Sequence, residues 1–117
     1  MKFITFVTTT NPAEAGPPPP ALMQAVIALG MEAGAGLVES GGMSDTATIK
    51  VRSSQLITDG PFTEAKELVG GYAIYDLPSQ ADIVSWTQRF ADLHRQHWPQ
   101  WEGEITIQQL HAFSMPG

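Results

Sequence analysis

The sequence contains no cysteine, which excludes disulfide bonds, thiolate nucleophiles and cysteine-based metal sites. Basic residues are scarce too: the chain has six Lys and Arg but twelve Asp and Glu, which gives a net charge of −6. They form no cluster that could neutralise a row of phosphates, so we expect neither direct nucleic-acid binding nor attraction to an anionic membrane. The apolar run at residues 3–7 is too short for a signal peptide or a membrane span. We therefore expect a cytoplasmic protein.

Charged residues make up only 15% of the chain, whereas about 25% is usual for a globular domain. The length of 117 residues suits one domain covering residues 1–117. A surface with so little charge predicts that part of it is buried against another chain.

Hydrophobic periodicity predicts an α+β fold. Helical spacing predicts helices over residues 21–35 and 79–97, the second one capped by Ser79 together with Asp82. A loop is expected over residues 11–20, and a strand beginning at residue 37 is expected to be interrupted at Ser40-Gly41-Gly42. Further strands are predicted at residues 3–9, 46–52, 55–58, 70–77 and 104–110.

This order of elements is that of the ferredoxin-like βαββαβ fold, an antiparallel sheet with two helices on one face. On the last strand, Ile105 and Ile107 suit the helix side, and Thr106, Gln108 and Leu110 suit the opposite side. Two helices cover only one face of the sheet. The simplest cover for the other face is the same face of a second copy, so the pattern predicts a homodimer.

The motif Asp59-Gly60-Pro61-Phe62 lies within residues 57–72, which resemble the signature of the DGPF branch of the YCII-related family. Residues 94–104 are similar to one subset of that branch. The resemblance implies a dimeric α/β barrel, formed by two ferredoxin-like sheets, with a pocket between sheet and loops. A few YCII-related members resemble lyases or dehalogenating enzymes that use a His–Asp pair. Asp59 can correspond to that aspartate, but residues 1–93 hold no histidine, so the pair is not carried over.

Asp59 is the candidate catalytic residue. It either accepts backbone N–H groups within its turn or acts as a general base at the rim of a pocket. Phe62 and Lys66 follow it and would help to bind a ligand, Lys66 by orienting an anionic group. Tyr72 and Tyr75 fall on opposite faces of one strand, so one packs under the helices and the other faces the dimer cavity.

His94 and His97 are three residues apart on the second helix. That spacing can bind a metal only if further ligands converge. We expect no metal and no cofactor, and a surface or interface position for both histidines.

Two functions fit the sequence. The first is a homodimer that binds a small organic molecule, with cofactor-independent proton transfer or lyase chemistry and Asp59 as the base. The second is a non-catalytic interaction or regulatory module. The resemblance suggests it, because some DGPF members are found beside sigma factors of the extracytoplasmic type. The sequence alone does not decide whether the protein is an enzyme.

Overall fold

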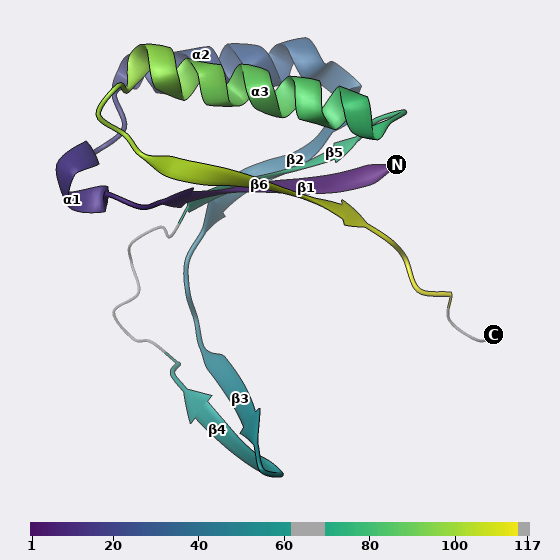
Figure 1. Ribbon diagram of the computed structural model, residues 1–117. Helices are drawn as coiled ribbons and strands as arrows, with labels where there is room; N and C mark the ends of the chain where they lie inside the picture. Colours follow the sequence, from purple (N-terminus) through teal and green to yellow (C-terminus); the bar gives the residue numbers. More distant parts are fainter. Residues whose placement is uncertain (62–69, 115–117) are drawn as a thin grey trace.

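An antiparallel sheet carries two helices on one side and a two-stranded arm on the other (Figure 1). The computed structural model describes residues 1–61 and 70–114. The strands are β1 (Lys2–Thr9), β2 (Leu37–Met43), β3 (Thr48–Arg52), β4 (Gln55–Asp59), β5 (Gly70–Asp76) and β6 (Gly103–Leu110). The helices are α1 (Pro12–Ala15), α2 (Pro20–Ala33), α3 (Gln80–His97) and the 3-10 turn η1 (Gly34–Gly36).

The main sheet has the strand order β2-β5-β1-β6 with antiparallel neighbours. This arrangement confirms the α+β, ferredoxin-like prediction. Phe3 on β1 lies opposite Tyr75 on β5, and Thr5 lies opposite Ile107 on β6. Phe3, Thr5 and Tyr75 are buried beneath the helices. Because side chains alternate along a strand, the residues between them point to the uncovered face.

The core between sheet and helices consists of two clusters. One joins Phe3, Tyr75 and Ile83 of α3, with Ile107 packed against them, as the alternation of the last strand predicts. The other joins Ala15, Leu22 of α2 and Trp98. The two clusters hold α2 and α3 on the same face of the sheet.

Both long helices begin within one residue of the predicted starts. Pro20 occupies the first turn of α2, where a missing N–H costs nothing. The Ser79 hydroxyl accepts the backbone N–H of Asp82 at 3.2 Å and donates to the Asp82 carboxylate at 2.9 Å. None of the helices in residues 1–61 and 70–114 is long and apolar enough to cross a membrane.

The strands β3 and β4 form a separate sheet that projects from the main one. We call this hairpin, Thr48–Asp59, the arm. Ser53 and Ser54 at its tip have φ of 49° and 63°, as a tight two-residue hairpin turn requires. At its base Gly60 has φ +111°, and a Cβ there would lie 2.8 Å from that of Ala47. Glycine is therefore required at this turn.

Two local predictions were wrong. Residues 11–20 contain the short helix α1. The strand β2 runs without a break through Ser40-Gly41-Gly42 because these residues pair in register with β5. The sequence also favours a short helical turn over residues 64–68, with Thr63 as its cap, but these residues lie outside the described part of the chain.

Candidate functional site

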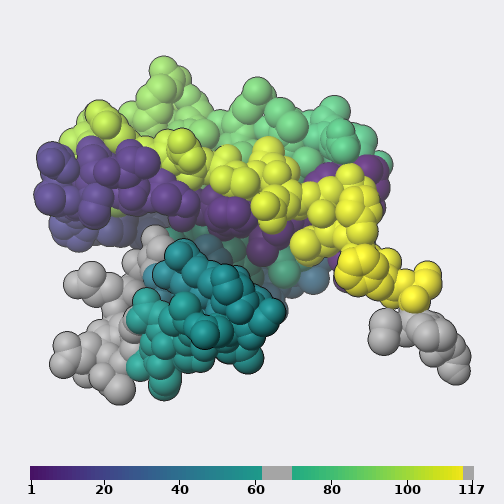
Figure 2. Space-filling view, turned by 60° about the horizontal axis from the view of Figure 1, so that its bottom comes forward, coloured from purple at the N-terminus to yellow at the C-terminus, as the bar shows by residue number. Residues whose placement is uncertain are grey.

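The face of the main sheet opposite the helices is not covered by any element in the described part of the chain. We call it the open face. Figure 2 views the molecule with this side brought forward and shows the teal arm projecting from it. At its centre Ile4, Phe6, Tyr72 and Ile74 are only half-buried. The open face continues onto β6, because Phe6 on β1 pairs with Thr106 on β6. The result is an apolar floor with a few polar groups, the usual make-up of a small-molecule site.

Tyr72 and Glu39 form the polar pair of the open face. The Tyr72 hydroxyl donates to the Glu39 carboxylate at 2.8 Å. This hydrogen bond raises the pKa of Tyr72, because the negative carboxylate favours the neutral phenol. The phenol is therefore protonated at neutral pH and serves as a hydrogen-bond donor.

Gly41 places the Tyr72 ring. A Cβ on Gly41 would lie only 3.1 Å from Cε1 of Tyr72, so the ring lies against the glycine backbone. Any larger residue at position 41 would require the ring to move.

Glu39 was not singled out by sequence reasoning, for a physical reason. Simple alternation from Leu37, which packs on the core, would point Glu39 toward the helices. The register between β2 and β5 shifts between Leu37 and Glu39. This bulge turns Glu39 to the open face. A bulge depends on strand pairing and leaves no clear signal in the sequence.

Tyr75 is the tyrosine that packs under the helices. Its side chain is buried against Phe3 and Ile83, and burial raises its pKa. Tyr72 is therefore the one that faces the open side, which the sequence left undecided.

Asp59 is exposed at the end of β4, opposite Thr48. Within residues 1–61 and 70–114 its carboxylate has no hydrogen bond or ion pair. Phe62 and Lys66 lie outside the described residues. The structure does not bring Asp59 and Tyr72 together within one chain, because one lies on the arm and the other on the main sheet (Figure 1). The catalytic role of Asp59 and the ligand-binding roles of Phe62, Lys66, Tyr72 and Tyr75 stay predictions.

His94 is buried, so its expected surface position was wrong, whereas His97 is exposed. The His94 ring lies 4.6 Å from that of Trp101 and 4.7 Å from that of Phe90. Burial lowers its pKa, and a 3.0 Å hydrogen bond between Nδ1 and the Phe90 carbonyl opposes this only in part. His94 follows Ile83 and Phe90 by eleven and four residues, so helical spacing could have revealed its buried position.

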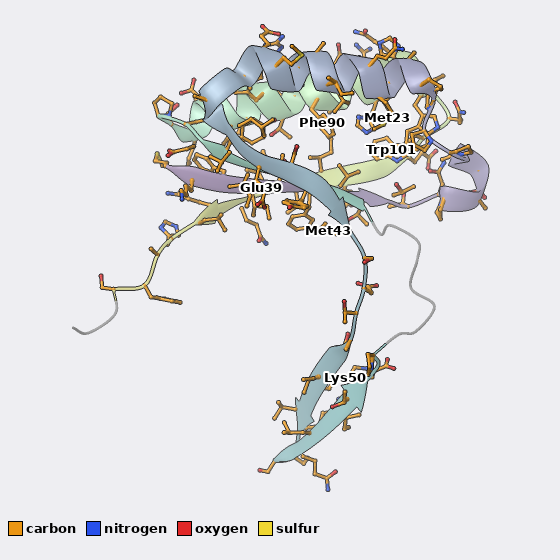
Figure 3. All side chains as sticks on the ribbon, turned by 180° about the vertical axis from the view of Figure 1, so that it is seen from behind. Met23, Glu39, Met43, Lys50, Phe90 and Trp101 are labelled. Carbon is orange, nitrogen blue, oxygen red and sulfur yellow. The ribbon has the colours of Figure 1, made fainter. Side chains whose placement is uncertain are left out.

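The aromatic cluster around His94 fastens the end of α3 to the rest of the domain. Trp98 donates its indole N–H to the Ala15 carbonyl at 3.0 Å, and Trp101 donates to the Thr9 hydroxyl at 2.9 Å. Figure 3 shows Phe90 and Trp101 between the helices and the sheet, and Glu39 and Met43 along β2. The cluster is therefore a packing element. Within the described residues no fully buried side-chain nitrogen or oxygen atom lacks a hydrogen-bond partner, and no group of three or more His, Asp and Glu side chains could hold a metal.

The open face presents the Tyr72–Glu39 pair beside its apolar floor. The phenol can donate to an oxygen atom, and the carboxylate can accept a proton or a hydrogen bond.

No curated protein shows a significant sequence match to the chain. The model of the YCII-related domain matches residues 24–93, more than half of the chain. The protein therefore belongs to the YCII-related family.

Proposed function

We propose that the protein is a homodimer whose two open faces enclose a site for a small organic molecule. Its chemistry would be cofactor-independent proton transfer or elimination. The Asp59-Gly60-Pro61-Phe62 motif supports membership of the DGPF branch. The scattered basic residues argue against nucleic acid as a ligand, and the proposed site of action is the cytoplasm.

One observation carries this proposal, namely that Tyr72 and Glu39 form a hydrogen-bonded pair on an uncovered, partly apolar sheet face. Glu39 is exposed to water, and a hydrogen bond between exposed groups adds little stability. A second sheet over the open face would enclose both groups in a cavity with an apolar floor, as in many ligand sites. A carboxylate in such a cavity can act as a base, and the neighbouring phenol can stabilise negative charge on the ligand.

A thermal-shift screen with small organic acids, phenols and divalent metals tests the proposal, because a ligand selective for the native state raises the melting temperature. We expect one organic class to stabilise the wild type and to lose its effect in Tyr72→Phe and Glu39→Gln. Glu14→Gln, on an exposed residue of α1, is the matched control and should respond like the wild type. A shift that persists in both site variants would contradict the proposed site.

Asp59→Asn separates the two roles of Asp59. Because the carboxylate is exposed, we expect a change in unfolding free energy within about 0.5 kcal/mol. We also expect loss of the thermal shift given by the ligand class found in the screen. A variant that unfolds instead, by circular dichroism, would show that the carboxylate serves the turn.

A second function, a non-catalytic interaction or regulatory module, is favoured by the outer side of α2. Met23, Ile27 and Met31 lie four residues apart and are 49%, 60% and 78% exposed. Exposed apolar stripes often mark protein contacts, and methionine adapts to varied partners. A sigma factor is one candidate partner. If no compound stabilises the protein, a pull-down with purified sigma factors would test this function. The wild type should bind and the Ile27→Ser/Met31→Ser variant should not.

A further inference from the structure

The arm is amphipathic and exposes its apolar side. Cross-strand pairing places Ile49, Val51 and Leu56 on one side, and Lys50, Arg52 and Ile57 on the other. Ile49, Val51 and Leu56 are 64%, 70% and 73% exposed. The alternation of apolar and charged residues along β3 is typical of a strand with one face packed and the other in water. The sequence of the arm therefore fits a partner on its apolar side.

The arm has no such partner within its own chain. It stands on the side of the sheet opposite the helices (Figure 1), and an isolated two-stranded hairpin is only marginally stable in water. The radius of gyration is 16.9 Å, whereas a compact domain of this length has about 13 Å. The single chain is therefore more extended than a self-sufficient domain.

A matching apolar groove lies on the far edge of the molecule. A hollow of about 230 Å³ runs between α3 and the edge strand β6. Its lining includes Val84, Thr87, Ala91, Trp101, Ile105 and Ile107. Val84 is 43% exposed at its rim. The chain's own arm cannot fill this groove, because the arm leaves the sheet from β2 and β5 and projects away from the helix layer.

We propose that the apolar side of each arm lies in the α3–β6 groove of a second copy of the chain. This rests on the proposed homodimer, in which the two open faces meet. A two-fold axis between the faces and parallel to the strands carries the β2 edge of one sheet to the β6 edge of the other. It directs each arm past the partner's β6 toward its helix layer.

The reach of the arm agrees with this path. Ser53 at the tip lies ten positions after Met43, at the end of β2, and ten extended steps can span about 33 Å. Two packed layers, sheet on sheet and sheet on helix, place the partner's helices about 20 Å away. The arm is therefore long enough to cross the partner's sheet and contact α3.

Exchange of the arms enlarges the interface. The flat footprint of a four-stranded face about 19 Å wide and about 25 Å long is about 500 Å². Two exchanged arms supply additional apolar area at the edges. They also cover β6, an otherwise unprotected edge strand.

Disulfide trapping tests the proposal directly, because the wild type has no cysteine. Chains carrying Val51→Cys on the arm are mixed with chains of different mass carrying Val84→Cys in the groove, and then oxidised. We expect a crosslinked heterodimer as the main product on non-reducing gels. Val51→Cys mixed with Ile27→Cys, which is 60% exposed on α2, is the matched control and should give background only.

A second variant measures the contribution of the arm. Ile49→Thr/Val51→Thr/Leu56→Thr keeps strand-forming side chains and removes apolar area, so the dimer dissociation constant should rise about tenfold or more. Ile27→Thr/Met31→Thr, equally exposed on α2, should leave it unchanged. If the wild type is a dimer but the Val51→Cys and Val84→Cys chains give no crosslink, or if the dissociation constant is unchanged in the arm variant, the arm proposal alone is overturned. A monomeric wild type overturns the proposed homodimer as well.

Discussion

Tyr72 and Tyr75 lie three residues apart on β5 and have different environments. Tyr72 donates to Glu39 on the open face, and Tyr75 is buried beneath the helices. Both pKa values are raised, the first by the hydrogen bond to a carboxylate and the second by loss of water. The two residues are therefore independent spectroscopic reporters of the two faces of the sheet.

Titration of tyrosinate absorbance can separate these two causes, because Tyr72 and Tyr75 are the only tyrosines. We expect both to ionise above the ordinary pKa of about 10. Glu39→Gln should move one transition down toward that value and leave the other in place. Two unchanged transitions in this variant would contradict the Tyr72–Glu39 hydrogen bond.

His94 makes stability depend on pH. Its folded-state pKa lies below the ordinary value of about 6.5, so the unfolded chain takes up the proton first as pH falls. Stability should be level above about pH 6.5 and decrease below it, by at most about 1.4 kcal/mol per pH unit for one proton.

Urea unfolding between pH 5 and 7.5 measures this effect. His94→Gln should flatten the dependence even if it lowers stability overall. His97→Gln, on an exposed residue of the same helix, should keep the wild-type profile. Equal pH profiles for the wild type and His94→Gln would show that another group is responsible.

At the scale of the element, α3 is defined by signals at both ends. Ser79 caps its first turn, and Arg95 occupies its last turn, where positive charge is favourable. The helix places Val84 and Thr87 along the groove and His94 under the tryptophans. The position of the groove therefore depends on where α3 begins.

The cap can be tested by a single substitution. Ser79→Ala removes the acceptor for the Asp82 N–H, and the unfolding free energy should fall by about 1 kcal/mol. Ser85→Ala, at an exposed position inside α3, should leave stability unchanged or slightly higher because alanine favours helix. Chemical denaturation compares the two, and an equal effect of both substitutions would argue against the cap.

For the whole molecule, the distribution of apolar surface is the main feature. The open face and the arm lie on the side of the sheet opposite the helices, and the groove lies between α3 and the edge strand β6. A single chain buries none of the three fully. A symmetric dimer can cover all of them with one repeated set of contacts.

Phe6→Lys tests the contact between the open faces. Phe6 lies at the centre of the open face, between Tyr72 and Thr106, and a buried ammonium there would have no partner. We expect a dimer for the wild type and a folded monomer for the variant, by light scattering and circular dichroism. Gln24→Lys, exposed on α2, should stay dimeric. A variant that remains a dimer would show that the chains associate through another surface.

The sequence by itself determined the two long helices, most of the strands and the fold class, because these rest on local periodicity and caps. The spacing of Ile83, Phe90 and Leu93 predicts α3, and Ser79 predicts its start. Alternation on the last strand also assigns Ile105 and Ile107 to the helix side correctly. These features depend on residues close together in the chain, so they can be read without tertiary contacts.

Only the tertiary structure decided the composition of the site. Glu39 joins Tyr72 across 33 residues through a bulge between paired strands, and the direction of Tyr75 follows from the side on which the helices pack. The separation of the arm from the main sheet likewise depends on which strands find partners. Such choices are set by pairing between distant segments, because local propensity is the same on both faces of a strand.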